Sequence, residues 1–159
     1  MFVLGHIGIG RLLVGSRGRG LPALPLLLGM LLPDLIDKPL YYAHLSSVIS
    51  CTRTFGHTGL FVALMLVLAY ARRSSAFLAV GLGMATHVAL DCLLDLLVSD
   101  TRSALTALAW PFVDTHFSTF NMSVADHLRR LLVTPVLVTE VIGLGLMAWE
   151  YWRSRYVRA

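Results

Sequence analysis

The chain has 159 residues, of which 57% are hydrophobic and only 14% are charged. Soluble proteins use roughly 25% charged residues, so this composition excludes an ordinary water-soluble globule and indicates lipid as the main solvent. The net charge of +4 comes from 13 basic and 9 acidic residues. The basic residues flank apolar stretches and form no single patch, so we expect no nucleic-acid partner.

Five apolar segments predict an all-α integral membrane bundle of four to five hydrophobic helices. The last two reach the roughly 20 residues that a bilayer crossing needs, and the first three are short enough to be tilted or half-buried. We expect the second segment to stop at Pro33 and Asp34, because proline interrupts a helix. The segments are residues 2–14, 21–36, 59–71, 76–98 and 131–152.

Residues 1–159 are predicted to form a single transmembrane domain, with a polar connection from about residue 99 to 130. Arginines are denser after the first, third and fifth segments than after the others, which predicts an N-terminus outside the cytoplasm and a C-terminus inside it. The G-H-I-G-I-G run at residues 5–10 follows no predicted strand. Close helix packing therefore explains its glycines better than phosphate binding does.

The fourth segment carries three ionisable residues where lipid alone would not tolerate them. His87, Asp91 and Asp95 are spaced i, i+4 and i+8, which places them on one face of a helix. An aspartate in the middle of a membrane helix costs about 2.5–3.5 kcal/mol on insertion scales, so these carboxylates need a partner. No Lys or Arg lies between residues 74 and 101. A divalent metal held by histidine and carboxylate would remove the penalty.

Three other segments bring His or Asp to a similar depth. His6 lies early in the first segment, Asp34 and Asp37 lie at the end of the second, and His57 opens the third. The two aspartates could instead end one helix and cap the next stretch of chain. The convergence of four segments is the strongest functional signal in the chain.

Four motifs resemble the YdjM-like family of inner-membrane-associated, metal-dependent hydrolases. They are L-L-P-D-L-I-D at 31–37, R-T-F-G-H-T at 53–58, G-M-A-T-H-V-A-L-D at 83–91 and A-W-P-F at 109–112. The order of His and Asp residues is similar, more distantly, to that of zinc-dependent phospholipase C. The resemblance implies the inner membrane of a prokaryote, and its motif positions fall on His6, Asp34, Asp37, His57, His87 and Asp91.

This sequence departs from the family pattern at one possible ligand. Thr52 stands where the family has a histidine, and the later His and His-x-x-x-Glu ligands of the phospholipase C group have no clear counterpart. Fewer metals, or a weaker site, are therefore expected.

These residues predict metal-assisted hydrolysis. One or two zinc ions, with manganese as the alternative, would lower the pKa of a bound water to about 7. Asp37 is the expected general base, and Arg53 is expected to clamp a phosphate oxygen. The expected site lies near the non-cytoplasmic face of the membrane, which indicates a phosphoester of a membrane lipid or a lipid-linked substrate. The expected metal ligands are His6, Asp34, His57, His87 and Asp91.

Ordinary structural interpretations remain open for the same residues. His87 and Asp91 could be a hydrogen-bonded helix pair without metal, His57 could be interfacial, and His6 could be a satisfied core residue. Asp95 could snorkel or accept from a hydroxyl. For the whole protein, the alternatives to an enzyme are a structural metal site, an ion or proton carrier, and a membrane adaptor.

Overall fold

The computed structural model describes residues 3–14, 20–42, 53–98, 103–113, 124–129, 132 and 134–156. Every regular element in these ranges is helical, which confirms the all-α prediction. In chain order the elements are α1 (Val3–Val14), α2 (Ala23–Tyr42), the 3-10 turn η2 (Phe55–His57), α3 (Gly59–Arg72), α4 (Ser75–Val98), α5 (Ser103–Ala109), α6 (Val124–Arg129) and α7 (Thr134–Tyr156).

One described helix is long and apolar enough to cross a membrane, judged by its length and composition. This stretch is Ser75–Leu97 within α4, whereas α1 and α3 are shorter apolar helices. Helix α7 has 23 residues but includes Glu140, Glu150, Arg153 and Arg155. The bundle of four to five membrane-crossing helices therefore stays a prediction.

The prediction that the second segment stops at Pro33 is wrong. Helix α2 continues to Tyr42 and contains both Pro33 and Pro39. A proline interrupts the hydrogen bonding of the preceding turn, but packing against neighbouring elements can supply other partners for the backbone. In that preceding turn, the Met30 carbonyl lies 2.6 Å from Nδ1 of His87 in α4. The continuation of α2 is what carries its two aspartates into the protein.

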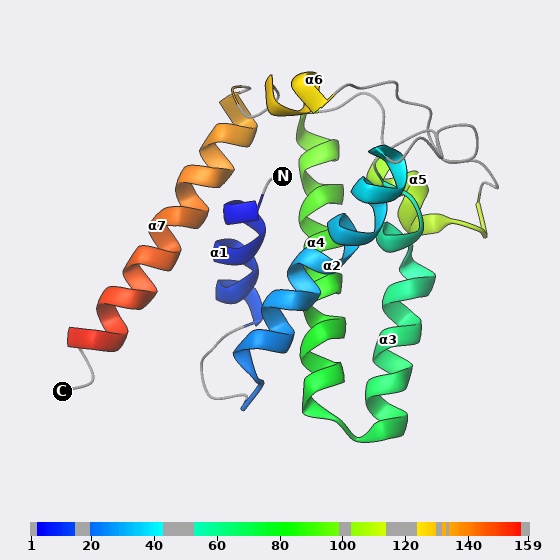
Figure 1. The fold of residues 1–159 in the computed structure, drawn as a ribbon, viewed down its shortest axis with the longest axis horizontal. Helices are drawn as coiled ribbons and strands as arrows, with labels where there is room; N and C mark the ends of the chain where they lie inside the picture. The colour runs from blue at the N-terminus through cyan, green and yellow to red at the C-terminus, as the bar shows by residue number, and fades with distance from the viewer. Residues whose placement is uncertain are drawn as a thin grey trace.

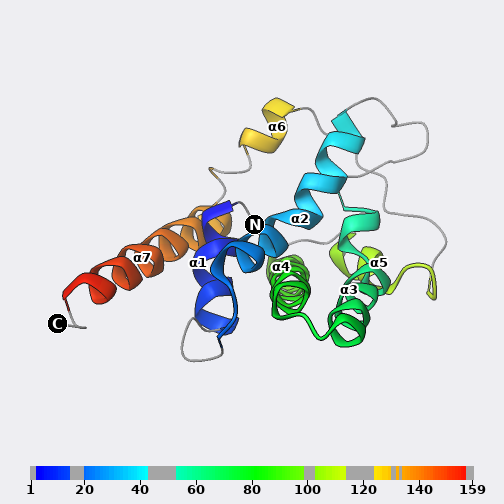
Figure 2. The same ribbon diagram turned by 60° about the horizontal axis from the view of Figure 1, so that its bottom comes forward.

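Helix α4 stands at the centre of the fold, with α1, α2 and α3 packed around it. Helices α1, α2, α3 and α5 all contact α4. Helix α2 crosses α4 obliquely, and α3 forms a hairpin with it, as Figures 1 and 2 show. Helix α7 lies on the far side of α1, away from α4 (Figure 2). Helices α5 and α6 lie within the polar connection, of which residues 99–102 and 114–123 are outside the described part of the chain.

Glycines allow α2 and α4 to approach until their backbones touch. A Cβ added to Gly29 would lie 2.2 Å from the Val80 carbonyl oxygen, and one added to Gly83 would lie 2.5 Å from that of Leu26. Such small-residue contacts are common between membrane helices, where close van der Waals packing drives association.

Helix α7 packs along α1. The Glu140 carboxylate accepts hydrogen bonds from the backbone N–H groups of Leu4, at 2.9 Å, and Gly5, at 3.1 Å. A carboxylate at a helix N-terminus pairs with otherwise unbonded N–H groups and with the positive end of the helix dipole. A Cβ on Gly8 would lie 2.1 Å from the Gly143 carbonyl oxygen, which confirms the predicted packing role of the early glycines.

Candidate metal centre

The helical spacing on α4 places its three ionisable side chains in the protein interior. His87, Asp91 and Asp95 are only 1%, 3% and 5% exposed. Since they are four residues apart, they form one row on the same helix face. This row is the framework on which the other elements place their polar groups.

The two aspartates of α2 have different surroundings. Asp37 is fully buried, and its carboxylate accepts from Thr54 N–H at 2.7 Å, the Thr54 hydroxyl at 3.0 Å and Gly56 N–H at 2.8 Å. Its fourth partner is the His57 ring, at 2.7 Å. The Asp34 side chain is 17% exposed and faces the same imidazole from one turn earlier in α2. Asp37 thus holds the η2 turn in place, and Asp34 remains nearer the surface.

Two imidazoles are fixed through their Nδ1 atoms. His57 Nδ1 lies 2.7 Å from a carboxylate oxygen of Asp37, and His87 Nδ1 lies 2.6 Å from the Met30 carbonyl oxygen. Carboxylate and carbonyl oxygens only accept, so each Nδ1 carries the hydrogen. In the neutral tautomer, both Nε2 atoms then present lone pairs, and they face each other 3.2 Å apart. Two lone pairs this close repel unless a proton or a metal ion lies between them.

Carboxylate oxygens surround this pair of nitrogens. Asp34 Oδ1 lies 3.8 Å from His57 Nε2 and 3.9 Å from His87 Nε2. Asp91 Oδ2 lies 3.5 Å and 4.0 Å from the same two atoms. Two nitrogen ligands at about 2.0–2.1 Å from a tetrahedral zinc ion lie about 3.3 Å apart, close to the observed nitrogen separation. Each carboxylate therefore lies near both nitrogens, at distances that a metal ion between them could bridge.

Helix α1 adds His6 to one side of this shell. The rings of His6 and His87 stack with centroids 3.8 Å apart and an interplanar angle of 17°. His6 Nε2 lies 3.4 Å from Asp91 Oδ1, the oxygen opposite the one that faces His57. Asp91 is consequently shared between His6 and the other two histidines.

Arg53 is the cationic partner of the α4 carboxylates. Its Nε donates to Asp91 at 2.9 Å, and one terminal nitrogen donates to Asp95 at 2.6 Å and to the Ser103 hydroxyl at 3.0 Å. Burial acts to lower the pKa of Arg53, but the two carboxylates raise it above its ordinary value. Asp95 also accepts from Ser103, as its hydroxyl-acceptor interpretation predicts, and from the Ala104 N–H. Arg53 thereby joins the segment before η2 to α4 and α5.

The charges of the described site leave room for a divalent cation. It contains four carboxylates and two cations, so two negative charges remain when the histidines are neutral: Asp34, Asp37, Asp91 and Asp95, against Lys38 and Arg53. Burial acts to lower the pKa of His57, but its hydrogen bonds with Asp37 and Asp91 raise that pKa to about 9. Without a metal, a proton on this ring offsets part of the negative charge. A metal would replace that proton.

Two overlapping groups of the described residues have the spacing to hold a metal ion. In each group, one ligand atom per residue lies within 4.8 Å of the others. His87 belongs to both groups. Because its Nδ1 is already bonded, only its Nε2 lone pair can bind a metal, and it can bind one ion at a time. Both groups therefore describe the surroundings of one centre. The groups are His6, His87 and Asp91, and Asp34, His57 and His87.

All seven residues singled out from the sequence come together here, with supporting groups that the sequence did not indicate. The Met30 carbonyl and the Thr54 hydroxyl orient ligand-bearing side chains, and Ser103 binds Asp95. These contacts join residues from different elements, so no local pattern predicts them. The missing cation for Asp91 and Asp95 comes from Arg53, 38 and 42 residues earlier in the chain. Thr52 lies outside the described residues.

Comparison with known proteins identifies a family. The model of the YdjM inner membrane protein family matches residues 1–157, a range that includes every residue of the candidate centre. Searches of the curated proteins and of the solved structures found no match. The distant similarity to zinc-dependent phospholipase C therefore stays a prediction. The chain belongs to the YdjM family of inner membrane proteins.

Proposed function

We propose that the protein is a membrane-bound, metal-dependent hydrolase that acts on a phosphoester of a lipid or lipid-linked substrate. The main support is the pair of Nε2 atoms of His57 and His87, 3.2 Å apart and each fixed by a bonded Nδ1. Asp34 and Asp91 complete a four-ligand shell around them, with His6 beside Asp91. A divalent ion held here, zinc or manganese, would supply a water with a pKa of about 7.

The geometry favours a positioning role for Asp37 over the general-base role expected from the sequence. Its two oxygens already accept four hydrogen bonds and it is fully buried. It keeps His57 in the tautomer that presents Nε2 as a ligand, the usual arrangement in carboxylate–histidine–metal triads. Asp34, at 17% exposure, is the most exposed carboxylate of the shell and is the one best placed to accept a proton from an attacking water.

Arg53 has a double role in this proposal. Its bonds to Asp91 and Asp95 fix the orientation of Asp91 as a ligand. Its side chain is 20% exposed, more than any histidine of the centre, so it is the cationic group of the site that an incoming substrate would reach first. A phosphate oxygen that reaches Arg53 could accept a hydrogen bond from it in place of one carboxylate. The five N–H donors of arginine permit such an exchange.

We also infer that α1, α2, α3 and α7 accompany α4 in the membrane. Apolar composition supports this for α1 and α3, and exposed apolar side chains on α7, such as Val141 and Leu144, support it there. The centre then lies toward the C-terminal end of α4, which the arginine distribution assigns to the non-cytoplasmic side. A lipid or lipid-linked phosphoester is the substrate class that such a position can reach.

Metal content of the detergent-purified protein tests the proposal first. Mass spectrometry should find bound zinc or manganese in the wild type and a large loss of it in His87→Ala and Asp91→Ala. Asp126→Asn is the control, because it removes a half-exposed carboxylate of α6 that pairs with neighbouring Arg129 and is not part of the centre. Hydrolysis of a phosphodiester such as bis-p-nitrophenyl phosphate should depend on the metal and stop with chelator. A folded wild type that takes up no metal would overturn the proposal.

A structural metal site is the second candidate, and the burial of the centre favours it. The histidines are at most 1% exposed, and four protein ligands would close a tetrahedral site. Cobalt substitution separates the two functions, since its visible spectrum reports coordination. A spectrum that shifts when inorganic phosphate is added indicates an open position and an enzyme. An unchanged spectrum, with no turnover, indicates a structural site.

A further inference from the structure

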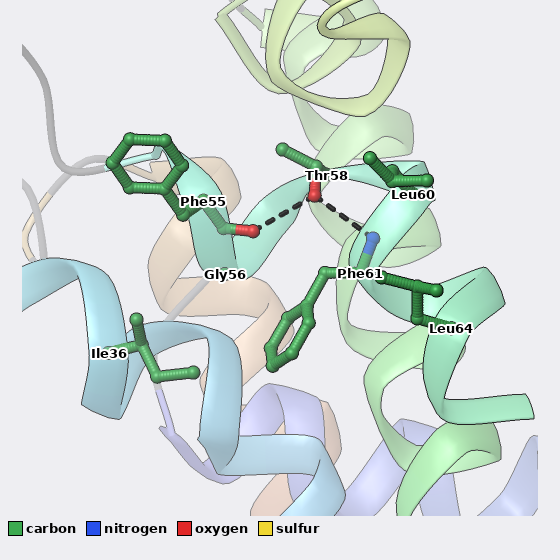
Figure 3. Close-up of a pocket in the computed structure, with 7 residues that line it drawn as sticks. All are labelled: Ile36, Phe55, Gly56, Thr58, Leu60, Phe61 and Leu64. Carbon is green, nitrogen blue, oxygen red and sulfur yellow. Dashed lines mark hydrogen bonds between the residues drawn. The ribbon is translucent and has the colours of Figure 1, made fainter. Parts of the chain in front are cut away.

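A pocket of about 340 Å³ lies against η2, between α2 and α3, and no candidate metal ligand lines it. Its walls come from α2, η2 and the first half of α3, and its volume is at the lower end of the roughly 300–1,000 Å³ of small-molecule sites. Figure 3 shows the seven residues that line it: Ile36, Phe55, Gly56, Thr58, Leu60, Phe61 and Leu64.

The lining of this pocket is apolar, so it can bind a hydrocarbon chain but not a polar ligand. Thr58 carries its only hydroxyl, which donates to the Phe55 carbonyl at 3.0 Å and accepts from Phe61 N–H at 3.1 Å (Figure 3). The Gly56 N–H donates to Asp37 behind the pocket wall. An ordered water needs two to four polar partners, and the side chains of this lining offer none that is not already bonded within the turn.

The pocket is continuous with an apolar face that the membrane would cover. Leu60 and Leu64 line it and are 37% and 57% exposed, and Val67, one turn farther along α3, is 62% exposed. Helix α3 packs beside the membrane-crossing α4. Its 14 residues give it a length of about 21 Å, less than the roughly 30 Å of the hydrocarbon core. With Arg72 held at one interface, the pocket at the other end of α3 lies at the depth of lipid chains.

We propose that this pocket binds one acyl chain of a membrane phospholipid. The chain would enter past Phe55, whose ring packs edge-on against Trp110 with centroids 5.7 Å apart, and extend along the pocket toward Leu64. Tryptophan favours the interface between lipid and water, so the chain would extend inward from the headgroup level. This site depends on the membrane location of the protein and not on a metal or on hydrolysis.

Photo-crosslinking tests the pocket directly. The purified protein is reconstituted in vesicles of phosphatidylethanolamine and phosphatidylglycerol that contain a phosphatidylglycerol with a mid-chain diazirine, and labelled peptides are mapped after irradiation. Labelling should concentrate on residues 55–64. Leu64→Trp, which fills the pocket, should reduce it several-fold. Tyr70→Trp is the matched control on the same helix, because Tyr70 is 86% exposed and lies outside the pocket; it should leave labelling unchanged.

Each other outcome of this experiment contradicts the proposal. Equal labelling along the exposed faces of α3 and α7 would indicate surrounding lipid only, and an absence of labelling at residues 55–64 would show that no acyl chain enters the pocket. Leu60→Trp repeats the test if Leu64→Trp does not purify as a folded protein. His87→Ala should keep the labelling while it loses metal, so failure of the chain site and failure of the proposed hydrolase are distinguishable.

Discussion

At the scale of single residues, the orientation of two imidazoles decides what the centre can do. His57 and His87 become ligands only because an acceptor holds each Nδ1, a carboxylate for one ring and a backbone carbonyl for the other. If either ring took the opposite tautomer, its Nε2 would carry hydrogen and could not bind metal. The acceptors are therefore as important to the proposed chemistry as the ligands themselves.

Asp37→Asn tests this dependence. The amide keeps the shape of the side chain but loses the charge, and it accepts through one oxygen where the carboxylate uses two. We expect metal affinity to fall about 10–100-fold, the usual effect of removing a partner that orients a ligand. Chelator competition measures the affinity, and circular dichroism checks the helical content. Unchanged affinity with lost turnover would instead support the general-base role that the sequence predicts.

At the scale of elements, helix faces were predictable and the contacts between helices were not. The spacing of His87, Asp91 and Asp95 is a local property, and it placed the three side chains on one buried row of α4. The η2 turn and the part of α2 after Pro33 depend on contacts made by distant parts of the chain, as in the bonds from Thr54 and Gly56 to Asp37. A proline by itself predicts the end of a helix. The bonds from Thr54 and Gly56 to Asp37 explain why α2 continues past Pro33.

Gly29→Ala tests the packing of α2 on α4. The added Cβ would lie 2.2 Å from the Val80 carbonyl oxygen, so the helices must separate. Overpacking costs about 1–3 kcal/mol in the free energy of unfolding, and separation would also pull the Met30 carbonyl away from His87. We expect a lower melting temperature in detergent together with reduced metal content. Gly145→Ala is the control, because nothing lies within 4 Å of its added Cβ and alanine favours the helix by about 1 kcal/mol. Equal stability of the two variants would show that α2 and α4 can separate at this contact without cost.

At the scale of the whole molecule, α7 is connected to the centre through α1. It packs on α1, and Glu140 accepts from the N–H groups of Leu4 and Gly5, directly before His6. His6 stacks on His87 and reaches Asp91, so the position of α1 sets one side of the ligand shell. The C-terminal helix is thereby connected to the centre without contributing a ligand.

Glu140→Gln measures this connection. The amide oxygen can still accept one hydrogen bond, but the negative charge at the N-terminus of α1 is lost, which weakens α1 docking by about 1–2 kcal/mol. We expect faster hydrogen exchange of the α1 amides and weaker metal binding, with the fold otherwise retained. Glu150→Gln is the matched control on the same two helices: Glu150 pairs with Arg11 at 2.9 Å, and their side chains are 27% and 31% exposed. A partly exposed pair of this kind contributes only about 0–1 kcal/mol, so its loss should leave exchange and metal affinity near those of the wild type. If Glu140→Gln behaves like Glu150→Gln, the charge of Glu140 is not needed to position α1 and His6.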